Sequence, residues 1–330
     1  MTDPMRFLFR SHLENLLDVR SCVTAVEDAF RRRGAGQLSP SGVLGIHANG
    51  GAFHTKAALL ELSRPYFAAK INANFPSNPS SHSLPTIQGV LVLFDAANGR
   101  VLAAMDSMTI TTLRTAAASA VAARYLARPE AHTAAFIGCG VQARAHVAAI
   151  ATVRDLQLAL VFDIDKKKAE HFAGEMRMLH TFDVRATDDV HHATAASDIV
   201  VTTTSSTKAF IGTGDISPGA FIAAVGADNE HKQEIDIALL AASAVVVDDL
   251  DQCATIGELH HALDAGVVTR DDVRATLGEV VAGVRPGRLS DSEIVIFDST
   301  GVAIEDVAVA AIAYERALAG GSGQLVQLND

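Results

Sequence analysis

One short segment limits the possible folds of this chain more than any other, namely Gly138-Cys139-Gly140-Val141-Gln142-Ala143 after the apolar run 133–137. Gly138 permits a tight turn, and Gly140 has no Cβ, so a phosphate can approach the backbone. Ala143 is small enough for a following helix to lie close to the strand. The helix N-terminus offers N–H groups and the positive end of a dipole. The segment therefore predicts a strand, a turn and a helix that bind a pyrophosphate.

A second predicted strand, residues 156–162, ends in Asp163, about 25 residues after Gly138. An acid at this point can accept hydrogen bonds from both ribose hydroxyls of NAD. Lys166, Lys167 and Lys168 follow and offer an alternative, because they would suit the 2′-phosphate of NADP. The other interpretation is a glycine-rich turn with a surface aspartate. The spacing favours a dinucleotide site, with NAD preferred over NADP.

The net charge of −11 opposes nucleic acid and anionic membranes as partners. No long apolar run lacks charges or glycine, so no membrane span is expected. Three widely spaced cysteines and no evident secretion signal favour a reducing cytoplasm. The length of 330 residues suggests two domains, or one domain with a large insertion.

The first hundred residues predict mostly antiparallel β-structure behind one amphipathic helix, residues 16–33. Strands are expected around 44–46 and over 66–75, and residues 76–85 read as a loop. Two further strands, 90–95 and 100–105, flank Asn98-Gly99, a strong hairpin signal.

After a long helix over 108–126, capped by Asp106 or Ser107, β and α patterns alternate. This alternation predicts a doubly wound parallel sheet with helices on both faces. Strands are expected at 133–137, 156–162, 199–202, 221–225, 244–247 and 294–298, and helices at 141–153, 166–179, 236–241, 257–265 and 303–319. The last helix returns to the first domain in this interpretation. We therefore expect residues 1–118 with 305–330 to form a discontinuous substrate-binding and dimerisation domain, and 119–304 an NAD(P)-binding domain.

Three side chains are candidates for chemistry on an amino or imino acid. Lys70 lies in an apolar strand, and Arg114 lies on an alanine-rich helix, where a guanidinium can bind a carboxylate through two bonds. Structural salt bridges explain both residues equally well. Asp228 follows a strand of the parallel sheet, where ligands collect, or it caps the next helix. The pairs His191-His192 and His260-His261 lack partners at metal-ligand spacing, so no metal is expected.

These signals converge in a resemblance to the ornithine cyclodeaminase/μ-crystallin family over nearly the whole chain. The matching blocks are Lys70-Ile71-Asn72 with Pro76-Ser77-Asn78, Leu84-Pro85-Thr86, Asp106-Ser107, 110–117, 138–143, Gly226-Ala227-Asp228 with Glu234-Ile235-Asp236, and 297–301 with Glu305-Asp306. The resemblance implies a Rossmann domain and a β-rich domain that forms a homodimer.

The resemblance also implies roles for individual residues. Lys70 matches a lysine that contacts substrate and donates a proton, Arg114 the carboxylate-binding arginine, and Thr86 a substrate-side threonine. Asp228 matches the active-site aspartate. The matching cofactor positions are Gly138, Gly140, Val141, Gln142, Ala143 and Asp163, and we expect Thr203, Ser205 and Ser299 beside the cofactor.

Two departures from the family pattern bear on the substrate. Ser39-Pro40-Ser41-Gly42 lacks the usual arginine, and Phe53-His54-Thr55-Lys56 stands where Met-Pro is usual. Cyclodeaminases that act on ornithine carry a glutamate near Lys56. We expect Lys56 and His54 to bind carboxylate instead, and a pocket of cations would repel a diamine.

The sequence therefore favours an NAD(P)H-dependent imine reductase or amino-acid dehydrogenase acting on a small or acidic substrate, of the iminosuccinate/aspartate or alanine/pyruvate type. One alternative is a cyclodeaminase that releases ammonia. A second is a μ-crystallin-like binding protein without catalysis, against which the joint presence of Lys70, Arg114 and Asp228 argues.

Overall fold

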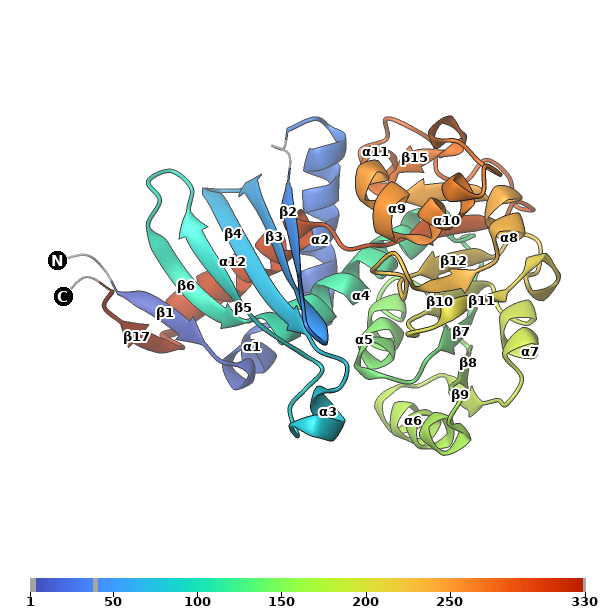
Figure 1. The fold of residues 1–330 in the computed structure, drawn as a ribbon, viewed down its shortest axis with the longest axis horizontal. Helices are drawn as coiled ribbons and strands as arrows, with labels where there is room; N and C mark the ends of the chain where they lie inside the picture. The colour runs from blue at the N-terminus through green and yellow to red at the C-terminus, as the bar shows by residue number, and fades with distance from the viewer. Residues whose placement is uncertain (1–3, 38–40, 329–330) are drawn as a thin grey trace. The chain divides into compact units, whose positions relative to one another are not determined.

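The computed structural model describes residues 4–37 and 41–328, and the chain divides into two compact units (Figure 1). Unit 1 comprises Met1–Thr115 and Val302–Asp330, and unit 2 comprises Ala116–Gly301. Unit 1 is thus built from both ends of the chain. Each junction lies three residues before the boundary expected from the sequence.

Unit 1 contains a seven-stranded sheet in the order β17-β1-β6-β5-β4-β3-β2, in which only β1 and β6 run parallel. The sequence indicated β4, β5 and β6 and part of β2. It did not indicate β3, or the short strands β1 and β17. The strands are β1 (Met5–Leu8), β2 (Gly42–Ala48), β3 (Gly51–Glu61), β4 (Pro65–Asn74), β5 (Ile87–Asp95), β6 (Val101–Asp106) and β17 (Gln324–Val326).

One face of this sheet is covered by α12 (Ala303–Gly320), which contacts β3 and β4, and α2 (Val19–Gly34) packs on α12. Small residues allow the close approach, since α12 is rich in alanine and its residues Ala303–Ala311 are all buried. The expected helix 16–33 begins at Val19, where the Asp18 side chain caps it. Residues 10–16 form a separate helix, α1 (Arg10–Leu16). The loop expected at 76–85 contains the one-turn helix α3 (Asn78–Ser81).

The helix α4 (Ser107–Leu126) continues the chain from unit 1 into unit 2. The expected cap is confirmed, because Asp106 Oδ2 accepts hydrogen bonds from the Thr109 N–H at 2.9 Å and the Thr109 hydroxyl at 2.7 Å. The second half of α4 is almost completely buried, as its alanine-rich sequence predicts.

Unit 2 contains an eight-stranded, wholly parallel sheet in the order β15-β14-β16-β12-β10-β7-β8-β9. Strands β8 and β9 extend to one side of β7, and β10, β12 and β16 to the other. The predicted doubly wound Rossmann fold is confirmed, with its topological switch point at β7. The strands are β7 (Thr133–Ile137), β8 (Leu158–Phe162), β9 (Asp183–Ala186), β10 (Ile199–Thr202), β12 (Phe221–Ala224), β14 (Ala244–Val247), β15 (Ala275–Thr276) and β16 (Val295–Asp298).

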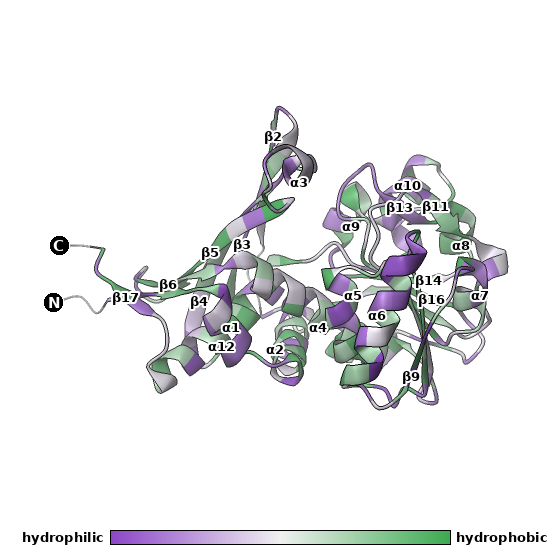
Figure 2. Cartoon of the chain, turned by 90° about the horizontal axis from the view of Figure 1, so that it is seen from below, coloured by the Kyte–Doolittle hydropathy of each residue, from purple (hydrophilic) through white to green (hydrophobic). Residues whose placement is uncertain are grey.

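The strands β10, β12, β14 and β16 are buried along their whole length, as expected for a sheet covered on both faces. The helix α6 carries many hydrophilic residues, drawn in purple in Figure 2, whereas its Phe172 and Met176 are buried. The sequence did not indicate the short elements α7, α9, α11, β9, β11, β13 and β15. The helices and remaining strands are α5 (Val141–Ile150), α6 (Lys166–Leu179), α7 (Val190–Ala195), β11 (Thr207–Ile211), β13 (Gln233–Ile235), α8 (Ile237–Ala241), α9 (Leu250–Ile256), α10 (Glu258–Asp264) and α11 (Leu277–Val281).

Candidate functional site

The glycine turn after β7 has the geometry that a dinucleotide needs. Gly138 has φ +93°, and a Cβ built on it would lie 3.0 Å from the Thr203 carbonyl oxygen. A Cβ on Gly140 would meet nothing within 4 Å, so the turn leaves open space before α5. Gly140 is the N-cap of α5 and provides no side-chain cap, and Ala143 is buried. This space at a helix N-terminus fits a pyrophosphate.

Asp163 is buried at the end of β8 and points to the same turn. Its Oδ2 accepts the Cys139 N–H at 2.9 Å and the Lys168 ammonium at 2.7 Å, and its Oδ1 accepts the Asp165 N–H at 3.1 Å. Burial raises the pKa of Asp163, but the hydrogen bonds from Lys168, Cys139 and Asp165 outweigh it and the net shift is downward. The residue is therefore a fixed carboxylate beside the glycine turn.

The three side chains expected on the other side of the turn all follow strands of the parallel sheet. The Thr203 hydroxyl donates to the Gly138 carbonyl oxygen at 3.2 Å, and Ser205 is exposed in the loop after β10. Ser299 follows β16 and is 2% exposed, yet its hydroxyl has no hydrogen-bond partner among the described residues. A buried hydroxyl in this position fits a polar ligand group.

Asp228 lies in the loop after β12 and is exposed. Its Oδ1 accepts the Lys232 ammonium at 2.7 Å. The interpretation of Asp228 as the cap of the next helix is wrong, because Asp236 caps α8 by accepting the Ala238 N–H. A carboxylate at the carboxyl end of a strand is thus available to a ligand of unit 2.

Unit 1 brings Lys70 and Arg114 together. We call these two residues, with Thr111, Glu305 and Asp306, the Lys70 cluster. The Lys70 ammonium lies 2.8 Å from Asp306 Oδ1 and 3.1 Å from the Thr111 hydroxyl. Arg114 Nε lies 3.1 Å from the same Asp306 oxygen, and its Nη1 lies 2.8 Å from Glu305 Oε2. Both cations are therefore held by buried carboxylates of α12.

Burial is the largest influence on Lys70 and lowers its pKa to about 8. Asp306 opposes this shift, while Arg114 and Lys56 add to it. An ammonium whose pKa is near neutral can give or take a proton at physiological pH.

Glu305 and Asp306 were not assigned a role by the sequence analysis. Their signal is two adjacent acids in the first turn of an otherwise apolar helix, which usually indicates a favourable interaction with the helix dipole. Both are instead buried, and Asp306 Oδ2 has no hydrogen-bond partner among the described residues.

Lys56 and His54 share the α12-facing side of the sheet with Lys70. In the register between β3 and β4, Lys56 pairs with Lys70 and His54 with Asn72, and paired residues project to the same face. Thr86 is further away, since its carbonyl oxygen accepts the Phe75 N–H, five residues beyond Lys70. At ~3.3 Å per residue, that is about 16 Å along the strand. Ser39 and Pro40, part of the segment without the family's arginine, lie outside the described residues.

The charge balance on this face differs from the sequence-based picture. That picture counted His54 with the cations Lys56, Lys70 and Arg114, whereas the structure adds the carboxylates Glu305 and Asp306 beside Lys70 and Arg114. The cluster is therefore close to neutral, and repulsion of a diamine by an all-cationic pocket is a weaker argument than the sequence suggested.

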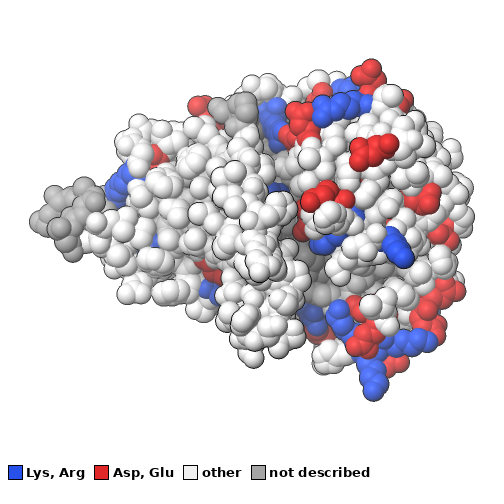
Figure 3. Space-filling view, viewed as in Figure 1, with Lys and Arg blue, Asp and Glu red and all other residues white. Residues whose placement is uncertain are grey.

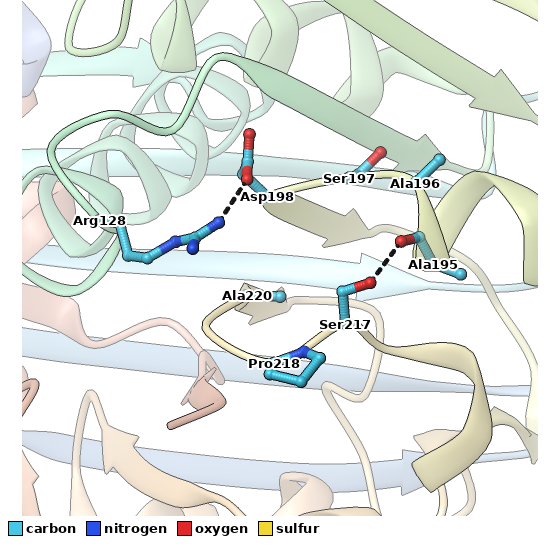
Figure 4. Close-up of a pocket in the computed structure, with 8 residues that line it drawn as sticks. All are labelled: Arg128, Ala195, Ala196, Ser197, Asp198, Ser217, Pro218 and Ala220. Carbon is cyan, nitrogen blue, oxygen red and sulfur yellow. Dashed lines mark hydrogen bonds and ion pairs between the residues drawn. The ribbon is translucent and has the colours of Figure 1, made fainter. Parts of the chain in front are cut away.

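A cavity of about 150 Å³ lies at the opposite, amino-terminal edge of the parallel sheet (Figure 4). Arg128 and Asp198 face each other across it and form an ion pair of 2.7 Å. Asp198 also accepts the N–H groups of His132 and Thr133, and it directly precedes β10. These polar groups join strand ends, and we assign them a structural role.

The pair His260-His261 has a structural role, whereas His191 and His192 are exposed. The His260 Nε2 bonds to the Glu230 carbonyl oxygen at 3.1 Å and the His261 Nε2 to that of Lys232 at 2.8 Å, so both hold the loop after β12. Across residues 4–37 and 41–328, no group of three or more His, Cys, Asp or Glu side chains is placed to hold a metal ion. None of the helices in these ranges combines the length and apolar character needed to span a bilayer.

A Rossmann unit with a dinucleotide turn, joined to a β-rich unit that buries a lysine beside an arginine, defines a class of cofactor-binding two-domain proteins. Residues 5–321 match the model of the ornithine cyclodeaminase/mu-crystallin family. The chain belongs to this family.

Two kinds of relatives illustrate the family's range. The chain is 37% identical to an alanine dehydrogenase of Archaeoglobus fulgidus over 97% of both chains. It superposes on an archaeal alanine dehydrogenase dimer with bound NAD with a TM-score of 0.93 and 36% identity, covering 98% and 99% of the two chains. The structure of an iminosuccinate reductase of Paracoccus denitrificans in complex with NAD⁺ gives a TM-score of 0.89 at 31% identity, covering 98% and 100%.

Proposed function

We propose that this protein is an NAD(H)-dependent oxidoreductase that reduces the C=N bond of a small or acidic 2-imino acid and oxidises the corresponding 2-amino acid in reverse. The observation that carries the proposal is the Lys70 cluster. A buried lysine with a pKa of about 8 lies beside an arginine, and a shared carboxylate orients both. Such a pair suits a substrate that has a carboxylate next to a nitrogen.

In this proposal each member of the cluster has one task. Arg114 binds the substrate carboxylate, and Glu305 and Asp306 fix the guanidinium in position. The Lys70 ammonium donates a proton to the imine nitrogen, and in the oxidative direction the neutral amine takes it back. Asp306 holds the ammonium and limits the fall of its pKa.

Unit 2 binds the dinucleotide. Gly138, Gly140 and the N-terminus of α5 receive the pyrophosphate, and Asp163 receives the adenosine ribose. Thr203, Ser205 and the buried Ser299 hydroxyl serve the nicotinamide half, with Asp228 on the same edge of the sheet. When bound, NADH supplies the hydride to the substrate carbon. The NAD-bound relatives support this assignment.

We propose a dicarboxylic substrate of the iminosuccinate/aspartate type. Lys56 and His54 lie on the same sheet face as Lys70, so they offer a second carboxylate site next to the one at Arg114. The relative named iminosuccinate reductase, which is 36% identical over 84% of this chain, supports this choice.

We also propose that unit 1 forms a homodimer through the open face of its sheet. Apolar side chains on β2, β3, β4 and β5 are 38–56% exposed there, and the surface over these strands carries almost no charge (Figure 3). They are Leu44, Ile46, Phe53, Ile71 and Val90. A patch of this kind is typical of a protein interface. Ile46→Lys should produce monomers in analytical ultracentrifugation, whereas a dimer unchanged by this charge would contradict the interface.

The central test is NADH oxidation with ammonia and a panel of 2-oxo acids that includes oxaloacetate, pyruvate and glyoxylate. We expect turnover with at least one of them and the highest kcat/KM with oxaloacetate. A Lys70→Met variant should bind NADH with unchanged affinity and lose turnover. Absence of turnover with every acid, or turnover that survives in Lys70→Met, would contradict the proposal.

The substrate assignment has its own test. Lys56→Met should lower kcat/KM for the dicarboxylic substrate by about 10- to 100-fold, because a charged hydrogen bond contributes about 1.5–3 kcal/mol. Lys56→Arg keeps the charge and should retain most activity. The pyruvate reaction serves as internal control, since it lacks the second carboxylate. Equal losses with both substrates would show that Lys56 does not bind the second carboxylate.

A further inference from the structure

Glu234 is one of the fully buried carboxylates to which the proposed mechanism gives no task. It lies in the short strand β13 and is 0% exposed. Within the described part of the chain, no cation is among the groups that hydrogen-bond to it. Its Oε1 accepts the Thr204 N–H at 2.7 Å, and its Oε2 accepts the Gly226 N–H at 2.9 Å and the Thr202 hydroxyl at 2.5 Å. Burying a carboxylate in this way is costly, so its three donors have to be held firmly in place.

These donors belong to the carboxyl ends of two neighbouring strands. Thr202 ends β10 and Thr204 lies in the loop 203–206, while Gly226 lies in the loop 225–232 after β12. The two strand-end loops carry Thr203, Ser205 and Asp228. One carboxylate therefore ties together both loops on the nicotinamide side of the switch point at β7.

Glu234 lies so close to residue 226 that this residue has to be glycine. A Cβ built on Gly226 would lie 2.4 Å from the Glu234 carboxyl carbon, so only glycine permits the contact. The loop 203–206 in turn touches the dinucleotide turn. A Cβ built on Gly138 would lie only 3.0 Å from the Thr203 carbonyl oxygen. Contacts thus run without interruption from Gly138 through Thr203 and Thr204 to Glu234 and Gly226.

We propose that Glu234 is a positioning residue that sets the two strand-end loops for the nicotinamide half of the cofactor. This inference rests on the proposed function, since it requires that unit 2 bind NADH. Glu234 touches neither reacting atom and acts through the backbone of Thr204 and Gly226. The adenosine ribose depends on a different group, Asp163, which follows β8 on the other side of β7.

Glu234→Gln tests the proposal because an amide has only one oxygen. In one orientation of the amide, its NH₂ group faces the Thr204 N–H. In the other orientation, it faces the Gly226 N–H and the Thr202 hydroxyl. At least one loop must then move. Glu258→Gln is the matched control, because Glu258 is also buried and accepts two backbone N–H groups, those of Glu234 and Ile235, without contacting either loop.

Affinities for NADH and for ADP-ribose, which lacks the nicotinamide, are measured by calorimetry. We expect Glu234→Gln to raise the Kd for NADH at least tenfold and that for ADP-ribose by less than twofold, and Glu258→Gln to change neither by more than threefold. Equal losses for both ligands, or the same NADH loss in Glu258→Gln, would overturn the proposal.

If Glu234→Gln does not fold, Thr202→Val removes one donor and keeps the other two, and we expect a threefold rise in the Kd for NADH alone. Wild-type affinity for NADH in Thr202→Val would then overturn the assignment. A wild-type protein that fails to bind NADH would contradict the proposed function instead, which keeps the two failures distinct.

Discussion

Asp306→Asn changes one atom in the Lys70 cluster and removes the negative charge that Lys70 and Arg114 share. The Lys70–Asp306 pair is 2.8 Å long, with side chains 4% and 3% exposed. Removing one partner of a buried ion pair costs about 3–5 kcal/mol, because the other charge stays desolvated. Domains are typically stable by about 5–15 kcal/mol, so unit 1 should lose about a fifth or more of its free energy of unfolding.

The second effect of Asp306→Asn concerns Lys70 itself. Asp306 raises the pKa of Lys70 against the effect of burial, so without it the pKa should fall below its present value of about 8. A smaller fraction of Lys70 is then protonated at pH 7. Imine reduction, which needs the ammonium as proton donor, should become slower and reach its highest rate at lower pH.

Urea unfolding of wild type, Asp306→Asn, Lys70→Met and the double variant measures the coupling. The double variant should lose at least 2 kcal/mol less than the sum of the single variants, because it removes both charges together. Asp188→Asn is the control, since Asp188 forms a still shorter but exposed pair with Lys166, at 2.6 Å, and its loss should leave stability unchanged. A loss below about 1 kcal/mol in Asp306→Asn, or additive single variants, would refute the reasoning.

Four further predictions follow from the same structure. Because Lys70 has a pKa of about 8, the rate of reduction should fall as the pH rises through 8 and the rate of oxidation should rise, which a pH profile of kcat shows; parallel profiles would exclude Lys70. Asp163→Ser should raise the NADPH/NADH ratio of kcat/KM at least tenfold, measured with both cofactors, because it leaves Lys168 to meet a 2′-phosphate. Gly226→Ala should weaken NADH binding selectively, and calorimetry that finds wild-type affinity would contradict the close contact. Burial raises the pKa of Asp298 from 3.8 to about 7, so its contribution to stability should decline by up to about 4 kcal/mol from pH 4 to 7, and the difference in urea stability between wild type and Asp298→Asn should show this slope.

The sequence predicted those features that depend on local pattern. The turn at Gly138 depends on backbone conformation, and the period-two alternation of Tyr66, Ala68 and Lys70 places all three on the buried face of β4. The doubly wound sheet follows from the alternation of apolar runs and helical patterns. Local chemistry was sufficient for each of these features.

Long-range partners were beyond that reasoning. Asp306 is 236 residues from Lys70 in the chain, so no spacing rule connects them, and two acids in the first turn of a helix suggest dipole interactions. Glu234 is similar, because a glutamate in a three-residue strand usually indicates a surface position. In both cases the tertiary fold creates the buried environment that gives the carboxylate its role.

The arrangement of unit 1 has a consequence for the biosynthesis of this protein. Arg114 and Lys70 leave the ribosome 191 and 236 residues before the acids of α12 that neutralise them. At a synthesis rate of ~5–20 residues per second, Lys70 waits about 10–50 s for Asp306. The nascent N-terminal sheet therefore cannot bury this lysine with its counter-ion until α12 has been synthesised. A ribosome-bound chain that stops before α12 should accordingly have an N-terminal region still open to proteases and chaperones.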